Sequence, residues 1–530
     1  MPFARLLCLL AAFFASPVLA DRASLASALC APEISGQVAA LVALAEAGAS
    51  GGPEEARWAQ TVVAAAEGRT LRCAEGIPFI GEGDAALDAA TLAPAPAPAE
   101  AAGLPVNNRV RATAASAAAA LSLFADTDDA AARTAAAAAL ERRREALTLG
   151  ILEAALAIET NAGVAGSLEA LRARMLLDDP DPGNRVLAIE AIAADATLRN
   201  RTLVAEAIGA ETDPQVIAAG ETALAAIDRE LAAGRVLAAL YSGLSYGSVL
   251  LLAALGLAII FGLMGVINLA QGEFIMIGAY AAWFVQNAIR AAAPGLLDWY
   301  LIVALPVSFV AAAMIGLVME ALVLRRLYDR PLMTLLATWA VSLLLINLVR
   351  VTIGTQNLEF HQPFYVTGGV PLMGDFIMTW NRLFAIGVAV AAFVGVVVLL
   401  RYSTFGMNVR AVAQNRAMAG AAGIDTRLTD RMAVALGSGL AGLAGVALAP
   451  LYNVNPNMGA GFIVDSFMVV VLGGVGSLAG AVVASLGIGQ ISVIMEPLYG
   501  AVAAKVVVLL LVIAFIQWRP EGLFAPKGRR

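Results

Sequence analysis

The side chains that usually perform enzyme chemistry are rare in this chain, and their spacing excludes the common reaction classes. There is a single histidine, His361, so we expect neither a histidine-ligated metal site nor a Ser-His-Asp triad. The two lysines, Lys505 and Lys527, are not preceded by glycine, whereas a phosphate-binding loop requires Gly-Lys followed by Ser or Thr. We therefore expect no enzyme, no cofactor and no metal, and no hydrolysis of ATP by that route.

The N-terminal residues indicate export, and export bears on the state of the cysteines. Residues 1–20 have the features of a signal peptide, with Arg5, a short apolar run and a small residue, Ala20, at the cleavage point; a retained signal anchor is the alternative. Cleavage would remove Cys8. The two cysteines that stay, Cys30 and Cys73, are then predicted to form a disulfide, and two free buried thiols are the alternative.

Composition excludes a single soluble body. Hydrophobic residues make up 60% of the 530 residues and charged residues 14%, whereas soluble domains contain about 25% charged residues. The charge is also uneven, because residues 1–234 carry 17 basic and 30 acidic side chains and residues 235–530 carry 17 and 11. An acidic first half without a basic stripe also argues against nucleic-acid binding.

The first half of the chain is Ala-rich, with apolar residues at helical spacing. We expect a small exported helical region at 21–90, a stiff Pro/Ala linker at 91–105 and an exported helical domain at 106–232. Asp181-Pro182 and Asp213-Pro214 each precede an apolar-periodic segment, which is consistent with a helix-pair repeat or with a plain bundle. This half contains no catalytic constellation, so a scaffold or docking surface is the leading interpretation.

The second half contains apolar runs that are long enough to cross a bilayer, which takes about 20 residues each. The runs lie near 236–262, 266–287, 299–324, 332–350, 383–400, 431–451, 462–475, 476–495 and 501–518. The fold class is thus all-α, a polytopic helical membrane protein of eight or nine spans (236–518) with an N-terminal exported helical domain. The count is open because Gly473, Gly474 and Gly476 interrupt the 462–495 stretch. The excess of Arg in the 325–330 and 401–431 loops and in the 519–530 tail places these parts in the cytoplasm, and an exported N-terminal region then favours nine spans.

Two stretches inside the apolar region carry polar or flexible residues at membrane depth. In the first, Asn268, Gln271 and Glu273 are costly in hydrocarbon, by about 3 kcal/mol for a carboxylate, so they are expected to line a solute path. Packing of small residues, with Asn268 as a hydrogen-bonding group, is the alternative. The glycine break at Gly473, Gly474 and Gly476 is a second candidate for the path, while Asp465 and Lys505 are expected at the periplasmic rim.

The 401–431 loop contains a candidate coupling element. Residues 408–422 have short helical character, and Gly423 is placed to end the helix. Such a helix is too short to be stable alone and is suited to a partner's groove, although a solvated connecting helix is the alternative. The polar residues available for a partner are Arg410, Gln414, Asn415 and Arg416.

Four motifs in one order resemble a known family. They are Arg401–Asp425 (RYSTFGMNVRAVAQNRAMAGAAGID), Gly265–Glu273 (GVINLAQGE), Leu472–Ser477 (LGGVGS) and Arg519–Phe524 (RPEGLF). Residues 237–526 thereby resemble the branched-chain amino-acid-type ABC transporter permeases, and the exported region ahead of them resembles the urea-transporter subgroup. One departure is Gln271, where many relatives carry His; it bears on the role of that side chain and not on the fold.

The resemblance implies an inner-membrane permease subunit that imports a small polar solute, with urea as the first candidate. It also implies two cytoplasmic ABC ATPase subunits, a second permease subunit and a periplasmic solute-binding protein as partners, besides membrane lipid. A branched-chain amino acid or a short amide is the alternative solute. Two other classes stay open, a secondary transporter that uses Glu273 or Asp465, and a membrane-anchored scaffold that moves no solute.

Overall fold

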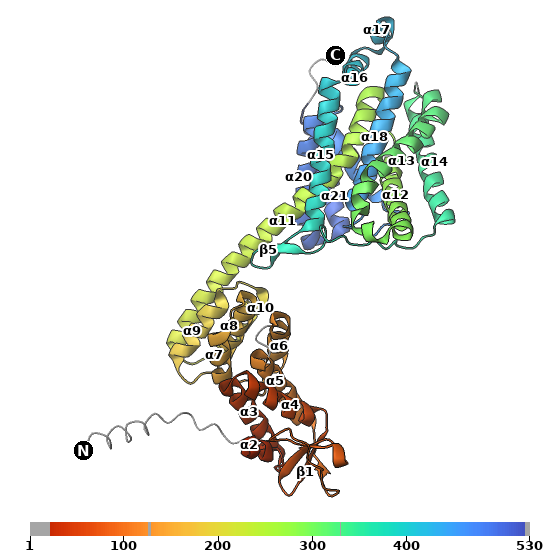
Figure 1. Ribbon diagram of the computed structural model, residues 1–530. Coiled ribbons are helices and arrows are strands. Elements are labelled where there is room, and N and C mark those ends of the chain that lie inside the picture. Colours follow the sequence, from red (N-terminus) through yellow and green to blue (C-terminus); the bar gives the residue numbers. More distant parts are fainter. Residues whose placement is uncertain (1–21, 126–128, 329, 525–530) are drawn as a thin grey trace, which may run out of the picture. The chain divides into compact units, whose positions relative to one another are not determined.

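The computed structural model describes residues 22–125, 129–328 and 330–524, and the chain divides into two compact units between Arg229 and Glu230 (Figure 1). The division falls inside helix α11 (Pro214–Met264), which therefore contributes residues to both units. The expected signal peptide, residues 1–20, lies outside the described residues.

The first unit begins with three helices, a small sheet and a further helix. The elements are α2 (Arg22–Ala28), α3 (Ile34–Gly51), α4 (Pro53–Glu67), β1 (Leu71–Ala74), β2 (Ile77–Ile80), η1 (Gly83–Ala85), β3 (Leu87–Asp88), β4 (Ala102–Gly103) and α5 (Asn108–Ala125). The strand order is β3-β2-β1-β4, and every neighbouring pair is antiparallel. The core lies between α3, α4 and α5, where Leu41, Leu44 and Leu121 are fully buried.

The sheet corrects the expectation of a purely helical 21–90 region. Glu75 and Gly76 both have positive φ (51° and 82°), which gives the tight turn that joins β1 to β2. Neither strand is longer than four residues, so both are too short to show an alternating apolar pattern in the sequence.

Residues 91–105 also differ from the expected linker, because they fold back onto the first unit. The amide of Ala95 donates to the carbonyl of Ala86 at 2.9 Å, and that of Leu104 donates to Leu71 at 3.1 Å. The alanines of the Ala-Pro run keep the N–H groups that the prolines lack, so the run can be anchored at alternate positions.

The helices that follow form two similar groups of three. They are α6 (Ala130–Arg142), α7 (Leu149–Ile158) and α8 (Ala162–Leu176), followed by α9 (Pro182–Ala193), α10 (Leu198–Ala210) and the start of α11. Arg133 pairs with Glu159 and Arg185 with Glu211, in both cases across 26 residues and with Nε–Oε2 distances of 2.8 Å. The repeat length is about 50 residues, which is near that of helical repeat arrays.

This repeat differs from the predicted one. Asp181 does begin α9, where its side chain accepts from the Gly183 amide, and Asp213 accepts from Gln215 at the start of α11. The counterpart of Asp181, however, is Asp129 at the start of α6 and not Asp213. Both Asp-Pro pairs therefore mark helix starts, but these starts lie within one group of three helices.

The second unit is a helical bundle, as the apolar runs predict. Its further elements are α12 (Gln271–Ala292), η2 (Pro294–Trp299), α13 (Tyr300–Leu322), η3 (Leu324–Arg326), α14 (Pro331–Thr352), β5 (Gly369–Met373), β6 (Phe376–Thr379), α15 (Trp380–Tyr402), α16 (Thr404–Gln414), α17 (Arg416–Ala421), α18 (Thr426–Leu448), α19 (Ala460–Gly473), α20 (Leu478–Tyr499) and α21 (Ala501–Trp518). Within the described residues, seven helices are long and apolar enough to cross a membrane.

The ambiguous 462–495 stretch consists of two helices, α19 and α20. Helix α19 has 14 residues, which gives a length of about 21 Å against a hydrocarbon core of about 30 Å. It is therefore too short to cross a bilayer by itself.

Helices α12, α13 and α18 pack through small residues at the centre of the bundle. A Cβ atom at Gly278 of α12 would overlap the carbonyl oxygen of Gly442 on α18. The Ser308 hydroxyl of α13 donates to the Gly278 carbonyl at 2.8 Å. The backbones of the three helices are thus in nearly direct contact, as is typical of membrane helices that associate through small residues.

Candidate translocation path and coupling site

A break between α11 and α12 positions the first group of predicted polar residues. Gly265 adopts a φ of +66°, and residues 265–270 are not helical. The side chain of Asn268 accepts from the Ala270 amide at 3.0 Å, and the hydroxyl of Thr338 on α14 accepts from the Leu269 amide at 3.2 Å. Side chains thereby satisfy the backbone where the helix is interrupted at membrane depth.

Asn268, Gln271 and Glu273 lie together and face protein, with exposed fractions of 0%, 1% and 3%. Gln271 donates from Nε2 to the Gly437 carbonyl of α18 at 3.0 Å, which links α12 to α18. Glu273 lies beside Ser342 of α14, and its Oε2 atom has no hydrogen-bond partner among the described residues.

The predicted glycine break occupies another place, at the junction of α19 and α20. Gly474 and Gly476 have φ values of +96° and +79°, so the chain turns there in a conformation that favours glycine. The amide of Phe524 donates to the Gly473 carbonyl at 3.2 Å, so the start of the 519–530 tail covers this junction.

The predicted 408–422 helix is divided in two. Asn415 has extended dihedral angles (φ −153°, ψ 102°) and separates α16 from α17, and its side chain accepts from the Met418 amide at 3.0 Å. Asn is a good N-cap residue and interrupts the helix by taking this role. At the other end, Gly423 has a φ of +87°, and the Ile424 amide reaches back to Ala419 at 3.0 Å, which is the expected glycine-terminated helix end.

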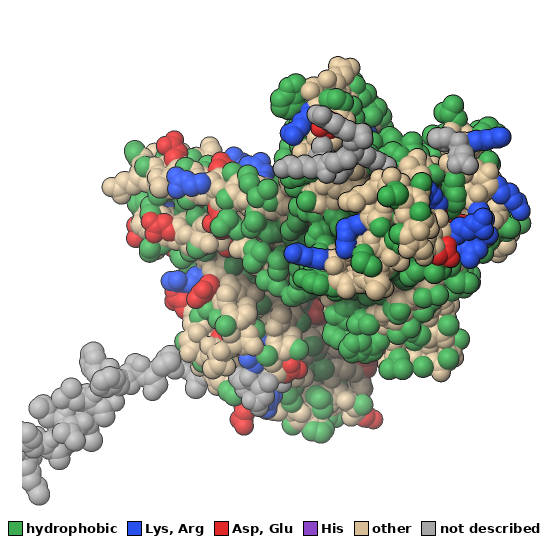
Figure 2. All heavy atoms as spheres, turned by 90° about the horizontal axis from the view of Figure 1, so that it is seen from above, with side chains coloured by type: hydrophobic (Ala, Val, Ile, Leu, Met, Phe, Trp, Pro, Cys, Tyr) green, Lys and Arg blue, Asp and Glu red, His purple; other side chains and the backbone are tan. Residues whose placement is uncertain are grey.

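Arginines are spread over the end of the second unit that carries α16 and α17, and apolar side chains cover its flanks (Figure 2). Arg410 and Gln414 are exposed there. Together with Gly476 they line a cavity of about 730 Å³ between α11, α15 and α16. The structure thus brings part of the predicted glycine break next to the predicted coupling residues, whereas Asn268, Gln271 and Glu273 lie deeper in the bundle.

A charge network around two buried carboxylates connects α17 to two spanning helices. The guanidinium of Arg416 contacts the fully buried carboxylate of Asp430 on α18 and lies 5.9 Å from the ring centre of Tyr328. The Tyr328 hydroxyl donates to Glu320 of α13 at 2.9 Å, and Arg325 and Arg431 lie 3.2 and 3.6 Å from the same carboxylate. Burial and the hydrogen bond to Glu320 raise the pKa of the Tyr328 phenol, so it remains a proton donor.

Sequence reasoning missed Glu320, Tyr328 and Asp430. Both carboxylates lie at the ends of expected spans and next to arginines, so they resemble ordinary loop charges. An acidic residue near a helix end and close to two or more arginines is a candidate for a buried ion pair. This pattern could have identified the two carboxylates.

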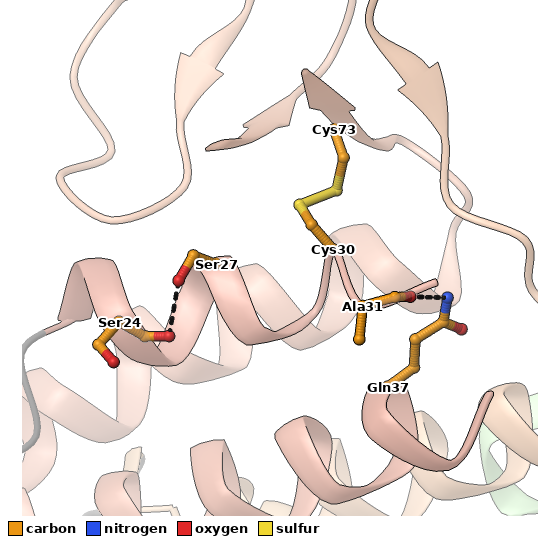
Figure 3. Close-up of a disulfide and its surroundings, with 6 residues drawn as sticks. All are labelled: Ser24, Ser27, Cys30, Ala31, Gln37 and Cys73. Atoms are coloured by element: carbon orange, nitrogen blue, oxygen red, sulfur yellow. Dashed lines mark hydrogen bonds between the residues drawn. A yellow bond between two sulfur atoms is a disulfide. The ribbon is translucent and has the colours of Figure 1, made fainter. Parts of the chain in front are cut away.

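In the first unit, Cys30 and Cys73 form a disulfide, with a Cα–Cα distance of 5.8 Å (Figure 3). Cys30 lies just after α2 and Cys73 lies on β1. The bond therefore joins the first helix to the small sheet.

Comparison with known proteins decides the family. The sequence profile described as branched-chain amino acid transport system / permease component matches residues 239–516, which is more than half of the chain. The chain belongs to this permease family. The match starts in α11 and ends in α21, so it covers the second unit and leaves the first unit outside.

Individual permeases of known transport systems are also similar to this chain. The high-affinity branched-chain amino acid transport system permease protein LivH of Escherichia coli (strain K12) is 29% identical over 293 residues, which are 54% of this chain and 94% of LivH. LivH of Salmonella typhimurium is 28% identical over the same length and shares, and BraD of Pseudomonas aeruginosa is 27% identical over 290 residues, again 54% of this chain and 94% of the relative. No solved structure matches the chain significantly.

Proposed function

We propose that this permease is the membrane subunit of an ATP-driven importer for a small polar solute, with urea as the first candidate. The family match over residues 239–516 carries the proposal of a permease. Urea is favoured because a separate unit of more than 200 residues precedes the matched region, and such a region ahead of the first span resembles the urea-transporter subgroup. The partners would be two ABC ATPase subunits, a second permease and a periplasmic binding protein.

The proposed topology places the first unit in the periplasm and α16, α17 and the C-terminus in the cytoplasm. The arginine-rich end of the second unit supports this orientation through the excess of positive charge that cytoplasmic loops carry. A disulfide between Cys30 and Cys73 supports an oxidising compartment for the first unit and cleavage of residues 1–20 before it.

Within the permease, we assign the ATPase contact to α16 and α17 and the solute path to the Asn268–Glu273 region. Arg410, Gln414 and Asn415 are exposed, and Arg416 is tied to α18 through Asp430. Movement of this segment would therefore reach α18, which is linked to Gln271 through Gly437. Because Asn268, Gln271 and Glu273 are fully enclosed, we interpret the arrangement as a closed path.

Branched-chain amino acids are the second candidate solute, because the LivH and BraD relatives carry that solute in their names. Uptake of radiolabelled urea and of radiolabelled leucine in a strain that lacks the gene, with and without the gene restored, separates the two. Each unlabelled solute, and a short amide, serves as competitor. Restoration of leucine uptake without urea uptake would contradict the first candidate, and restoration of neither would contradict the import function.

A cysteine introduced at position 268 or 271 tests the path. In a variant without the native cysteines, it should react with a small hydrophilic thiol reagent during ATP turnover and should be protected at rest. Protection under both conditions would show that the segment only packs the helices together.

A further inference from the structure

A second cavity lies in the second unit at the end of α15 that is farthest from α16. Its volume is about 750 Å³, and its wall is formed by α11, the first turn of α15, some residues of the 451–462 segment, the end of α20 and the start of α21. The wall combines hydroxyl and amide groups with charged side chains, including Ser245, Asn453, Ser492, Arg382, Glu496 and Lys505. A concave site with a few convergent polar groups is the usual form of a small-molecule site.

One pair of charges near this cavity is already satisfied. Asp465 is buried and accepts from the Tyr246 hydroxyl at 2.9 Å, and Lys505 lies 3.8 Å from the same carboxylate. Lys505 also donates to the Gly461 carbonyl at 3.3 Å. The Asp465 carboxylate is thus paired, and Lys505 is held at the wall by two contacts.

A second pair of charged side chains, Arg382 and Glu496, is available to a ligand. In the part of the chain that the structure describes, neither the Arg382 guanidinium nor the Glu496 carboxylate has a hydrogen-bond or ion-pair partner. Arg382 is half-buried and Glu496 is exposed, and both line the cavity together with Tyr452. A half-buried guanidinium without a partner is unfavourable unless a ligand or water takes its donors.

The start of α19 adds to the positive side of the cavity. Gly461 and Phe462 of its first turn line the wall, and Gly459, which precedes the helix, provides no side-chain cap. The N-terminal end of a helix carries partial positive charge.

We infer that this cavity binds the transported solute, with Arg382 donating to a carbonyl or carboxylate oxygen and Glu496 accepting from N–H groups. The inference rests on the proposed import function and names the residues that select the solute. It predicts a molecule of zero net charge that carries an acceptor oxygen and N–H donors within one small unit. Urea and an α-amino acid share this chemistry, and the experiment below distinguishes them.

The test uses the permease–ATPase complex in proteoliposomes without the binding protein, so that only sites on the complex are measured. Ser492→Cys in a Cys8→Ser background places one reactive thiol in the cavity, since Cys30 and Cys73 are bonded to each other. The rate of modification by a small hydrophilic thiol reagent is measured with urea, with leucine, and with tetramethylurea, which keeps the carbonyl group but has no N–H donor.

We expect urea or leucine to slow the modification about sixfold at about five times its Kd, because only empty sites react. Tetramethylurea should have no effect. Adding Arg382→Gln should weaken binding about tenfold or more, as the loss of a hydrogen bond to a charged group does. The matched control is Arg350→Gln, because Arg350 pairs with Asn457 outside the cavity wall, and it should leave the protection unchanged.

Uptake by the complete transporter, with binding protein, separates the possible failures. A transporter that imports urea or leucine while that solute gives no protection at position 492 would overturn the cavity assignment alone. Equal effects of Arg382→Gln and Arg350→Gln would overturn the role of Arg382. A transporter that imports neither solute would overturn the proposed function, and the cavity assignment with it. Unchanged co-purification of the ATPase shows that each variant is folded.

Discussion

Arg416, the first residue of α17, contacts the carboxylate of Asp430, which is fully buried in α18. A short helix at the surface is thus tied by charge to a spanning helix. The tie continues through Tyr328 to Glu320 on α13.

Removal of the arginine should destabilise the permease. Arg416→Ala leaves Asp430 buried without its cation, and we expect a loss of between about 1 and 3 kcal/mol because Arg416 itself is partly exposed. Heat-induced aggregation of the detergent-purified protein measures the effect. Arg427→Ala, which changes an exposed arginine in the first turn of α18, is the matched control. Equal melting temperatures for the two variants would contradict the importance of the ion pair.

The glycine that ends α17 should matter for coupling more than for folding. Gly423 has a φ of +87° and open space around its Cα, so Gly423→Val introduces backbone strain of about 1 kcal/mol without a clash. We expect normal insertion, but weaker ATPase co-purification or ATP hydrolysis without uptake. Gly420→Val, inside α17 and also in open space, is the control. If both variants transport normally, the ATPase contact lies elsewhere, and the 325–331 loop is the next candidate.

The central helix crossing should not accept even one methyl group. Gly278→Ala places a Cβ atom on the Gly442 carbonyl of α18, so we expect a loss of about 1–3 kcal/mol. Gly387→Ala on α15 meets nothing within 4 Å and should be neutral. The yield and melting temperature of the two purified variants provide the comparison, and a stable Gly278→Ala protein would show that α12 and α18 can separate.

The disulfide closes a loop with a sequence separation of 43. Cys73→Ala should lower the stability of the first unit by about 4 kcal/mol by the loop-entropy relation. Hydrogen exchange in α2 and β1 of the intact protein reports this loss. Mass spectrometry without reduction should find neither cysteine alkylated in the wild type, and free alkylation of both would contradict the bond.

Acid should weaken the repeats of the first unit. The Arg133 guanidinium, followed by the Asn161 and Thr160 amides, lowers the pKa of Glu159. The Asp213 amide, Arg185 and the Thr212 amide lower the pKa of Glu211 to about 2. Folding lowers the pKa of both carboxyl groups. The ionised carboxylates therefore stabilise the fold fully above the ordinary glutamate pKa, and this stabilisation is lost as the pH falls toward the pKa values of the folded state. Hydrogen exchange of α7 and α10 between about pH 5 and pH 3 should show this loss, and Glu159→Gln should make α7 less dependent on pH.

The membrane fold was largely predictable because each span must be a long apolar run. Within the described residues, nine helices correspond to the nine expected segments, although α12 begins at Gln271 and not at 266. The difference arises because Asn268 bonds to the backbone and holds residues 265–270 out of the helix. The local sequence pattern does not show this hydrogen bond or the break in the helix.

The candidate site was less predictable, because its contacts join distant residues. Gln271 reaches Gly437 across 166 residues, and Arg382 and Glu496 meet at one cavity only after α15 and α20 are packed. The short strands β1 to β4 were missed for a related reason. They are defined by their pairing with one another and not by a pattern within each strand.

The direct backbone contact between α12, α13 and α18 has a mechanical consequence. Side chains normally let neighbouring helices slide by changing rotamers, but glycine has none to change. A displacement of α18 at Asp430 would therefore carry α12 and α13 with it as one rigid body. The relative movement of helices during transport is then expected at the edges of this three-helix block, where side chains can change rotamer.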